Sequence, residues 1–317
     1  MRTIGASEID AALSFDALIA ALADGFRAGI TVPVRHHHTI PQEGRDATLL
    51  LMPAWMEKSG EGGRFLGCKI VSVFPDNALA GKPSVYGSYL LMDGTTGLPL
   101  AVMEGATLTA WRTAAASALA AKYLAREDAE HLVMIGAGTL APRLVQAHYS
   151  VRPIKRVTLW NRTRARAEAL ANQLKLPGVA VSVTDDLEQA VREADIVSCA
   201  TLSLEPLVHG AWLKPGTHLD LVGAFRPNMR EADDEAIKRS RVYVDTIAGV
   251  TREGGDIVQP LQSGALKMEQ IAGDLFGLTR GTVKGRSSAD EITLFKSVGT
   301  AIEDLAAAML VWRHLVG

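Results

Sequence analysis

The sequence has few of the features that mark disulfide-rich, metal-binding or nucleic-acid-binding proteins. Its 317 residues include only two cysteines, Cys68 and Cys199, which are too far apart to form a metal-binding pair or a disulfide framework. We therefore expect no metal site and a reducing compartment. The formal net charge of -2 gives no electrostatic reason to expect nucleic acid or an anionic membrane as a partner.

Long hydrophobic runs are also absent. No apolar run approaches the ~18 residues that a membrane span needs, and the N-terminus lacks a basic flank followed by an unbroken apolar core. Hydrophobic residues make up 48% of the chain and charged residues 21%, which is typical of globular domains. We expect a soluble cytoplasmic protein of one large or two ordinary domains, with no membrane partner.

The N-terminal region predicts an α+β arrangement. Apolar residues recur at helical spacing from Ser14 to Ala28, and strand-like runs follow at "TLLLMPAW", "FLGCKIVSVF" and "VYGSYLLMD". The alanine-rich "TLTAWRTAAASALAAKYLA" predicts a helix, because it contains no internal glycine or proline. We expect the strands of this region to pair as a meander.

From His131 the pattern changes to alternating strands and helices. Short β-branched runs occur at "LVMIGA", "RVTLWN", "VAVSV", "DIVSCAT", "HLDLVGA" and "RVYVDT". This alternation predicts a parallel sheet covered on both faces. The final stretch, "EITLFKSVGTAIEDLAAAMLVWRHLV", predicts a helix whose apolar positions nearly encircle it, so it must pack against another domain or subunit.

A dinucleotide-binding turn lies at the start of this second region. Gly136 and Gly138 follow the strand "HLVMI", and the small Ala141 opens the helix after them. The first glycine permits a tight turn, the second lets the backbone approach a pyrophosphate, and the helix N-terminus supplies N–H donors. A plain strand-to-helix turn would also need small residues, but the strand before and the helix after favour cofactor binding.

The end of the next strand predicts which dinucleotide binds. An acidic residue there would bind the ribose of NAD, whereas this chain has Asn161, Arg162, Thr163 and Arg166. Neutral donors and cations suit the extra phosphate of NADP. Arg164 and Arg166 could equally lie on a solvated helix face. We predict NADPH as the cofactor, with NADH possible.

Candidate anion-binding cations lie in the N-terminal region. Lys69 interrupts an apolar strand, and Arg112 lies in a helical stretch of small and apolar residues. Such cations are usually paired, and a substrate carboxylate is one possible partner. The segment "VPVRHHHTIP" adds Arg35 and three histidines; an extended chain would aim His37 to one side and its two neighbours to the other. One histidine could donate a proton, or all three could be surface residues.

With these residues in place, the chain resembles the ornithine cyclodeaminase/μ-crystallin family. The similarity is carried by "GCKIVSVFPDN", "GSYLLMDGTTGLPLAVMEGATLTAWRTAAASALAAKYLA", "MIGAGTLA", "LVGAFRPNMREAD" and "LFKSVGTAIEDLAAA". The resemblance implies an α/β protein in which a Rossmann-type NAD(P)-binding domain, residues 119–292, is inserted in an α+β substrate-binding and dimerisation domain, residues 1–118 plus 293–317. It also implies a homodimer.

By position, the resemblance implies that Lys69 and Arg112, with Arg35, contact a substrate carboxylate. We take Lys69, Arg112 and His37 as the candidate catalytic residues. Further predicted cofactor contacts are Thr139, Leu140, Thr201, Val222, Gly223 and Val298.

One position departs from the family's cyclodeaminases, which resemble one another in placing an aspartate two residues after the glycine of "VGAFRPN". Here Phe225 stands two residues after Gly223. Phenylalanine can neither accept a proton nor hydrogen-bond an ammonium group. Asn228 is polar, and we assign it no catalytic role.

We therefore predict an NADPH-dependent reductase of cyclic imine 2-carboxylates. Its substrates would be Δ1-pyrroline-2-carboxylate, giving L-proline, and Δ1-piperideine-2-carboxylate, giving L-pipecolate. The alternatives are an ornithine cyclodeaminase, an alanine dehydrogenase-type amino-acid oxidoreductase, and a non-enzymatic crystallin-type protein that binds NADPH and a ligand.

Overall fold

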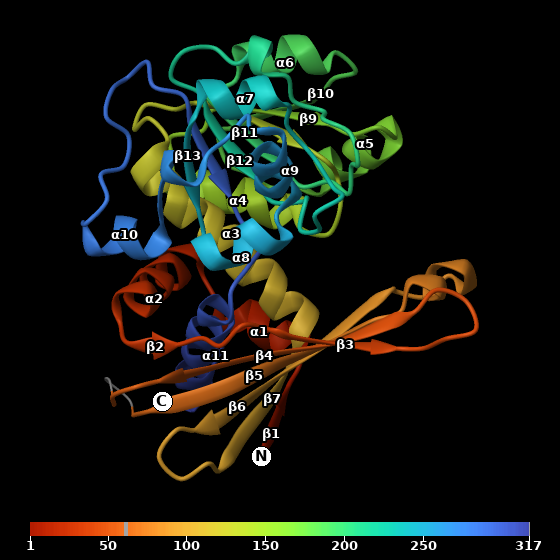
Figure 1. The fold of residues 1–317 in the computed structure, drawn as a ribbon, viewed down its shortest axis with the longest axis vertical. Helices are drawn as coiled ribbons and strands as arrows, with labels where there is room; N and C mark the ends of the chain where they lie inside the picture. The colour runs from red at the N-terminus through yellow and green to blue at the C-terminus, as the bar shows by residue number, and fades with distance from the viewer. Residues whose placement is uncertain (60–62, 317) are drawn as a thin grey trace. The chain divides into compact units, whose positions relative to one another are not determined.

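The computed structural model describes residues 1–59 and 63–316 and divides them into two compact units (Figure 1). The first unit comprises Met1–Arg112 together with Thr300–Gly317, and the second comprises Thr113–Gly299. Both crossings between the units lie some residues away from the boundaries expected at 118/119 and 292/293.

The described part of the first unit contains an antiparallel meander, as predicted. Strands β4, β5, β6 and β7 pair in chain order, β1 adds to β7 in parallel, and β2 and β3 both pair with β4. Figure 1 shows β3 with the adjoining end of β4 extending as an arm from the sheet. The strands are β1 (Arg2–Ile4), β2 (Ile30–Thr31), β3 (His36–Ile40), β4 (Ala47–Met56), β5 (Phe65–Val73), β6 (Val85–Asp93) and β7 (Pro99–Glu104).

Helices cover one face of this sheet. They are α1 (Ala6–Ala12), α2 (Phe15–Arg27) and α11 (Ala301–Val316), while α3 (Gly105–Leu124) begins here and continues into the second unit; η1 (Pro75–Ala80) is a short 3-10 turn. The side chain of Ser14 caps α2 by accepting a hydrogen bond from the backbone N–H of Ala17. Helix α11 packs on α2 and on the central strands, so most of its residues are buried.

The predicted final helix is wrong over its first part. Residues Thr293–Lys296 form β15, a fully buried strand of the second unit, and the helix begins only at Ala301. Gly299, whose φ is 81°, turns the chain between the strand and the helix. A short apolar run fits a buried parallel strand as well as a buried helix, which explains the error.

The second unit, all of which the structure describes, contains an eight-stranded parallel sheet. Its order is β10-β9-β8-β11-β12-β15-β13-β14, so the direction of strand addition reverses between β8 and β11, where dinucleotides bind in such sheets. The strands are β8 (His131–Ile135), β9 (Arg156–Trp160), β10 (Ala180–Val183), β11 (Ile196–Cys199), β12 (His218–Leu221), β13 (Arg241–Val244), β14 (Ile271–Asp274) and β15. This is the expected Rossmann-type fold.

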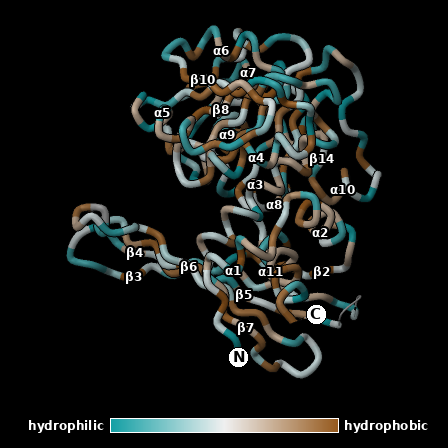
Figure 2. The backbone as a smooth tube through the Cα atoms, turned by 180° about the vertical axis from the view of Figure 1, so that it is seen from behind, coloured by the Kyte–Doolittle hydropathy of each residue, from teal (hydrophilic) through white to brown (hydrophobic). Residues whose placement is uncertain are grey.

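Helices connect the strands of this sheet, and hydrophobic residues concentrate along its central strands (Figure 2). The helices are α4 (Ala141–Val151), α5 (Arg164–Gln173), α6 (Leu187–Glu193), α7 (Asp234–Arg239), α8 (Ile247–Glu253), α9 (Gly255–Ser263) and α10 (Leu275–Arg280), with 3-10 turns η2 (Gly210–Trp212) and η3 (Met268–Gln270). A polar group is buried inside this core: Asp220 accepts hydrogen bonds from Ser198 (2.7 Å) and lies 3.1 Å from His148. No helix in the described part of the chain is long and apolar enough to cross a membrane.

Candidate functional site

Lys69 lies at the centre of the first unit's sheet. Its neighbours across the strands are Met52 and Tyr89, and all three side chains are buried on the face that α11 covers. Lys69 is only 3% exposed. A lysine so placed needs a charge partner, because burying an unpaired ammonium group is costly.

That partner comes from the other end of the chain. The ammonium nitrogen of Lys69 lies 2.9 Å from both carboxylate oxygens of Asp304, in the first turn of α11. Arg112, in α3, donates from Nε to Asp304 (3.0 Å) and from Nη1 to Glu303 (2.6 Å). Lys69, Arg112, Glu303 and Asp304 thus form a buried ionic cluster, and the partners of both cations, for which a substrate was one possibility, lie within the chain.

The sequence prediction missed Glu303 and Asp304. A signal was present, because "AIEDLAAAML" places two adjacent acids in a helix that is apolar on all sides. Charged residues on such a helix must be paired when it is buried. Both acids are fully buried here, and the positive end of the helix dipole favours their charge.

The cluster changes the ionisation of its members. Burial, reinforced by the positive charge of Arg112, lowers the pKa of Lys69 from 10.5 to about 8, although Asp304 opposes this shift. Burial opposes ionisation of Asp304, but Lys69 and Arg112 outweigh it and lower the pKa of that carboxyl. The charge of Arg35 contributes to both shifts. Arg35 is therefore near enough to act on the cluster electrostatically.

The histidine segment forms β3 at the edge of the sheet. The rings of His36 and His38 lie on one face, 6.3 Å apart, as alternation predicts. His37 pairs with Leu50, which pairs in turn with Val71, so His37 is on the same face as Lys69. All three histidines are exposed. Of the three, His37 alone shares the face of the buried cluster.

In the second unit, the glycine turn after β8 has the geometry that a dinucleotide needs. Gly136 has a φ of 102°, and a Cβ there would lie 2.6 Å from the carbonyl oxygen of Ala200. A Cβ at Gly138 would meet no atom within 4 Å, so open space borders the backbone at this position. Gly138 and Thr139 are exposed, Leu140 is half-buried, and α4 begins directly after them. These residues fit a pyrophosphate at a helix N-terminus.

The arginines that follow β9 differ in their ion pairing. Arg164 pairs with Glu168 (2.8 Å) and with Asp185, so it belongs to a surface ion-pair group. Arg162 and Arg166 are exposed and form no ion pair with a described residue. Asn161 accepts a hydrogen bond from the backbone N–H of Ala137 (3.2 Å), which links this strand end to the glycine turn. Thr163 is exposed beside them.

Two buried carboxylates hold three of the four remaining predicted cofactor positions. Glu231 accepts hydrogen bonds from the backbone N–H groups of Thr201 (2.6 Å) and Gly223 (2.7 Å). Asp245 accepts from the N–H of Val298 (2.7 Å). Val222 is 5% exposed and continues the pairing of β12 with β11, so its side chain packs into the core.

Phe225 follows the carboxyl end of β12, and it is 43% exposed. The guanidinium carbon of Arg226 lies 5.7 Å from the centre of its ring. Asn228, three residues further on, is also exposed. The position that carries an acid in the family's cyclodeaminases thus presents an aromatic surface.

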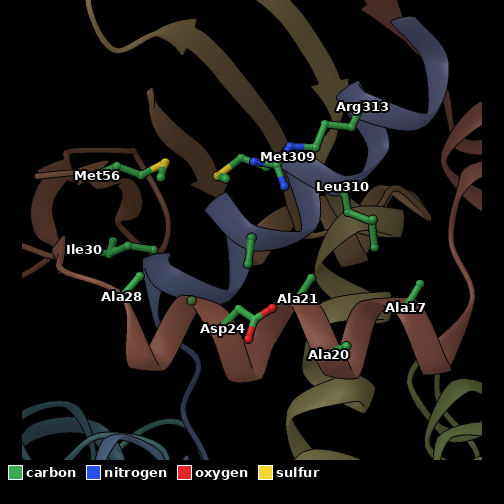
Figure 3. Close-up of a pocket in the computed structure, with 12 residues that line it drawn as sticks. Ala17, Ala20, Ala21, Asp24, Ala28, Ile30, Met56, Met309, Leu310 and Arg313 are labelled. Carbon is green, nitrogen blue, oxygen red and sulfur yellow. The ribbon is translucent and has the colours of Figure 1, made fainter. Parts of the chain in front are cut away.

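An apolar groove of about 400 Å³ lies elsewhere in the first unit, between α2 and α11 (Figure 3). Ala20 and Ala21 line one wall, and Met309 and Leu310 line the other. None of the predicted site residues lines it. Among residues 1–59 and 63–316, no group of three or more histidine, cysteine or acidic side chains is placed to hold a metal ion.

Comparison with known proteins gives the family. The model of the ornithine cyclodeaminase/mu-crystallin family matches residues 3–317. The chain belongs to this family. It is 40% identical to a Δ1-pyrroline-2-carboxylate reductase of Paracoccus denitrificans, over 90% of this chain and 91% of that protein.

Two solved structures are similar over the whole chain. A Thermococcus litoralis Δ1-pyrroline-2-carboxylate reductase in complex with NADH and L-proline matches with a TM-score of 0.92 and 35% identity, covering 100% of this chain and 98% of that one. An archaeal alanine dehydrogenase dimer with bound NAD matches with a TM-score of 0.90 and 30% identity, covering 100% and 96%. The fold class predicted from the sequence is confirmed.

The ionic cluster leads to a prediction about stability. Asp304→Asn should lower the free energy of unfolding by about 3 kcal/mol, because it leaves two buried cations without their shared carboxylate. Urea denaturation measures this change. Asp24→Asn is the matched control, since Asp24 pairs with Arg27 on the exposed face of α2 and should change stability little. Equal stability of the two variants would contradict the account.

Proposed function

We propose that this protein is an NAD(P)H-dependent reductase of cyclic imine 2-carboxylates, with Δ1-pyrroline-2-carboxylate and Δ1-piperideine-2-carboxylate as substrates and L-proline and L-pipecolate as products. The observation that carries this proposal is the buried ionic cluster of the first unit. The charge of Arg35 acts on both Lys69 and Asp304 of this cluster. Prearranged cations suit a ligand with a carboxylate group, because charge-assisted hydrogen bonds to a carboxylate are strong, which supports an acid as the substrate.

In this proposal Asp304 and Glu303 fix the cations rather than compete with the substrate. A guanidinium group has five N–H donors, so Arg112 can hold both carboxylates and still donate to a ligand. Fixing Lys69 and Arg112 in advance lowers the entropy cost of orienting the substrate. The substrate carboxylate would then set the position of the neighbouring C=N bond.

The chemistry needs few further groups. When bound, NADPH would supply the hydride that reduces the C=N bond at C2, and a protonated imine would thereby become an amine. The residues of this chain have to hold the imine protonated and exclude water. His37 is the proposed proton donor, because it lies on the cluster's face and a ring nitrogen of histidine can donate a proton.

Two observations weigh on the alternatives. Phe225 lacks the acid/base group of the cyclodeaminase position, so ornithine cyclisation is disfavoured. The relatives named as Δ1-pyrroline-2-carboxylate reductases support an imine over an α-keto acid as the substrate. An assay of nicotinamide oxidation with both imines, and with pyruvate plus ammonia, decides between these classes. Binding of NADPH without any turnover would instead support a crystallin-type binding protein.

The proposed carboxylate clamp predicts the effect of Lys69→Met. The variant should lower kcat/KM for Δ1-pyrroline-2-carboxylate by about 100-fold, the equivalent of about 3 kcal/mol for a charge-assisted hydrogen bond. Its Kd for NADPH should stay unchanged, since the predicted cofactor contacts lie in the second unit. The wild-type kcat/KM should also fall as pH rises through about 8, where Lys69 loses its proton. Full activity of Lys69→Met would contradict the proposed contact between Lys69 and the substrate carboxylate.

The preference for NADPH is predicted from the residues at the end of β9, and substitution of two nearby arginines tests it. Arg162→Ala should raise the Kd for NADPH by about 10-fold and leave that for NADH nearly unchanged, because only NADPH carries the extra phosphate. Arg164→Ala is the control, since Arg164 is already paired with Glu168 and Asp185. Fluorescence titration gives both constants. An unchanged ratio of the two constants in Arg162→Ala would overturn the choice of NADPH.

We also propose that the protein forms a homodimer through the sheet face opposite α11. That face carries apolar side chains that are only partly covered, among them Trp55 (36% exposed) and Ile70 (40%). The solved alanine dehydrogenase relative is a dimer. Ile70→Glu should give monomers in light scattering, whereas Leu98→Glu, in an exposed turn, should leave the dimer intact. A dimeric Ile70→Glu protein would exclude this interface.

A further inference from the structure

Glu231 is a fully buried acid that connects two strand ends of the second unit. One carboxylate oxygen accepts hydrogen bonds from the backbone N–H (2.6 Å) and the hydroxyl (2.8 Å) of Thr201, which follows β11. The other oxygen accepts from the backbone N–H groups of Gly223 (2.7 Å) and Ala224 (3.3 Å), which follow β12. A single side chain therefore satisfies four donors from two neighbouring strands.

A second buried acid holds Glu231 itself. The backbone N–H groups of Glu231 and Ala232 donate to Asp256, at 2.7 and 3.1 Å. The other oxygen of Asp256 lies 3.1 Å from the ammonium nitrogen of Lys296, the last residue of β15, and both side chains are fully buried. The acid that holds the two strand ends is thus fixed by a third strand and by α9.

The packing leaves no room for another arrangement at this point. A Cβ on Gly223 would lie 2.5 Å from a carboxylate oxygen of Glu231 and would also overlap the backbone of Thr201. Gly136 approaches the same strand end from β8, where its Cβ would meet the carbonyl of Ala200. The ends of β11 and β12 therefore meet at Glu231, and the end of β8 packs against the end of β11.

We propose that Glu231 is a positioning residue for the dinucleotide, holding Thr201 and Gly223 in the arrangement that binds the cofactor. The inference rests on the proposed NAD(P)H binding, since both residues are predicted cofactor contacts. It requires the ionised form of Glu231, because four N–H and O–H donors point at its two oxygens. A protonated carboxyl group would place its own O–H donor against one of these N–H or O–H donors.

The surroundings make this ionisation sensitive to pH. Burial raises the pKa of Glu231 to about 7; Asp256 adds to the shift, and Lys296 and the hydrogen-bonded thiol of Cys199 oppose it. These groups, from α9, β15 and β11, are the titratable side chains that face it. The affinity for NADPH should accordingly weaken as pH falls through about 7.

The test uses Glu231→Gln, with Asp220→Asn as the matched control. Asp220 is also a buried acid, and lies on β12, but its side chain lies within hydrogen-bond distance of Ser198 and His148, neither of which is a predicted cofactor residue. At pH 8, Glu231→Gln should raise the Kd for NADPH by about 10-fold, because an amide accepts with only one of its two ends. Asp220→Asn should leave that Kd near the wild-type value.

Two further measurements separate positioning from general stability. The decline in NADPH affinity between pH 8 and pH 6 should be smaller in Glu231→Gln than in the wild type. Hydrogen exchange of the Thr201, Gly223 and Ala224 amides in the cofactor-free protein should accelerate in Glu231→Gln and stay slow in Asp220→Asn. If Glu231→Gln fails to fold, Glu231→Asp serves instead, because its shorter side chain keeps the charge but reaches only one strand end.

The outcomes are distinct. Weaker NADPH binding together with faster exchange at the three amides supports the proposal. A Kd in Glu231→Gln or Glu231→Asp equal to that of Asp220→Asn overturns it. If the wild type itself binds no dinucleotide, the proposed function fails, whereas the exchange measurement still reports whether Glu231 holds the strand ends.

Discussion

The first unit depends on the burial of two cations against two acids. Lys69 comes from the middle of the sheet, Arg112 from a helix, and Glu303 and Asp304 from the first turn of α11. None of these side chains could be buried alone at an acceptable energy, so each requires the others. This mutual requirement fixes α11 against the sheet at one register. It also fixes two cations in place, and the charge of Arg35 acts on one of them, Lys69.

The second unit also contains buried acids, but these bind backbone N–H groups as well as cations. At the carboxyl edge of its sheet, Glu231 and Asp245 satisfy backbone N–H groups that the strands leave unpaired as they end. Such groups would otherwise need water or a ligand. The buried acids therefore hold the strand ends close together. The small residues of the glycine turn then provide open space beside them.

Much of the fold could be predicted because local patterns carry it. The meander follows from strand runs separated by short turns, and the Rossmann-type unit follows from the alternation of strands and helices around the glycine turn. The boundary of the last helix could not be predicted, since "TLFK" has the composition of either a buried strand or a buried helix, and only pairing with β12 and β13 decides it. Local pattern says little about such a segment.

The site shows the same division. Lys69 and Arg112 are visible in the sequence as cations in apolar surroundings, but their partners lie 235 and 192 residues away along the chain, and no local rule connects them. The sequence alone does not distinguish the environment of Arg162 from that of Arg164. The fold does so, because it places Glu168 and Asp185 beside Arg164. Glu231 lies within the motif "LVGAFRPNMREAD", yet the backbone groups that it binds belong to two strand ends that only the fold brings together.

In the proposed function, the buried cations of the first unit recognise the acid group of the ligand. Calorimetric titration of the protein, in the presence of NADP⁺, with L-proline and with L-prolinamide tests it most directly, because the two ligands differ only in that group. The account predicts that L-proline binds and that L-prolinamide binds at least about 100-fold more weakly, as expected for the loss of a charge-assisted contact. Equal affinity for the two ligands would contradict it.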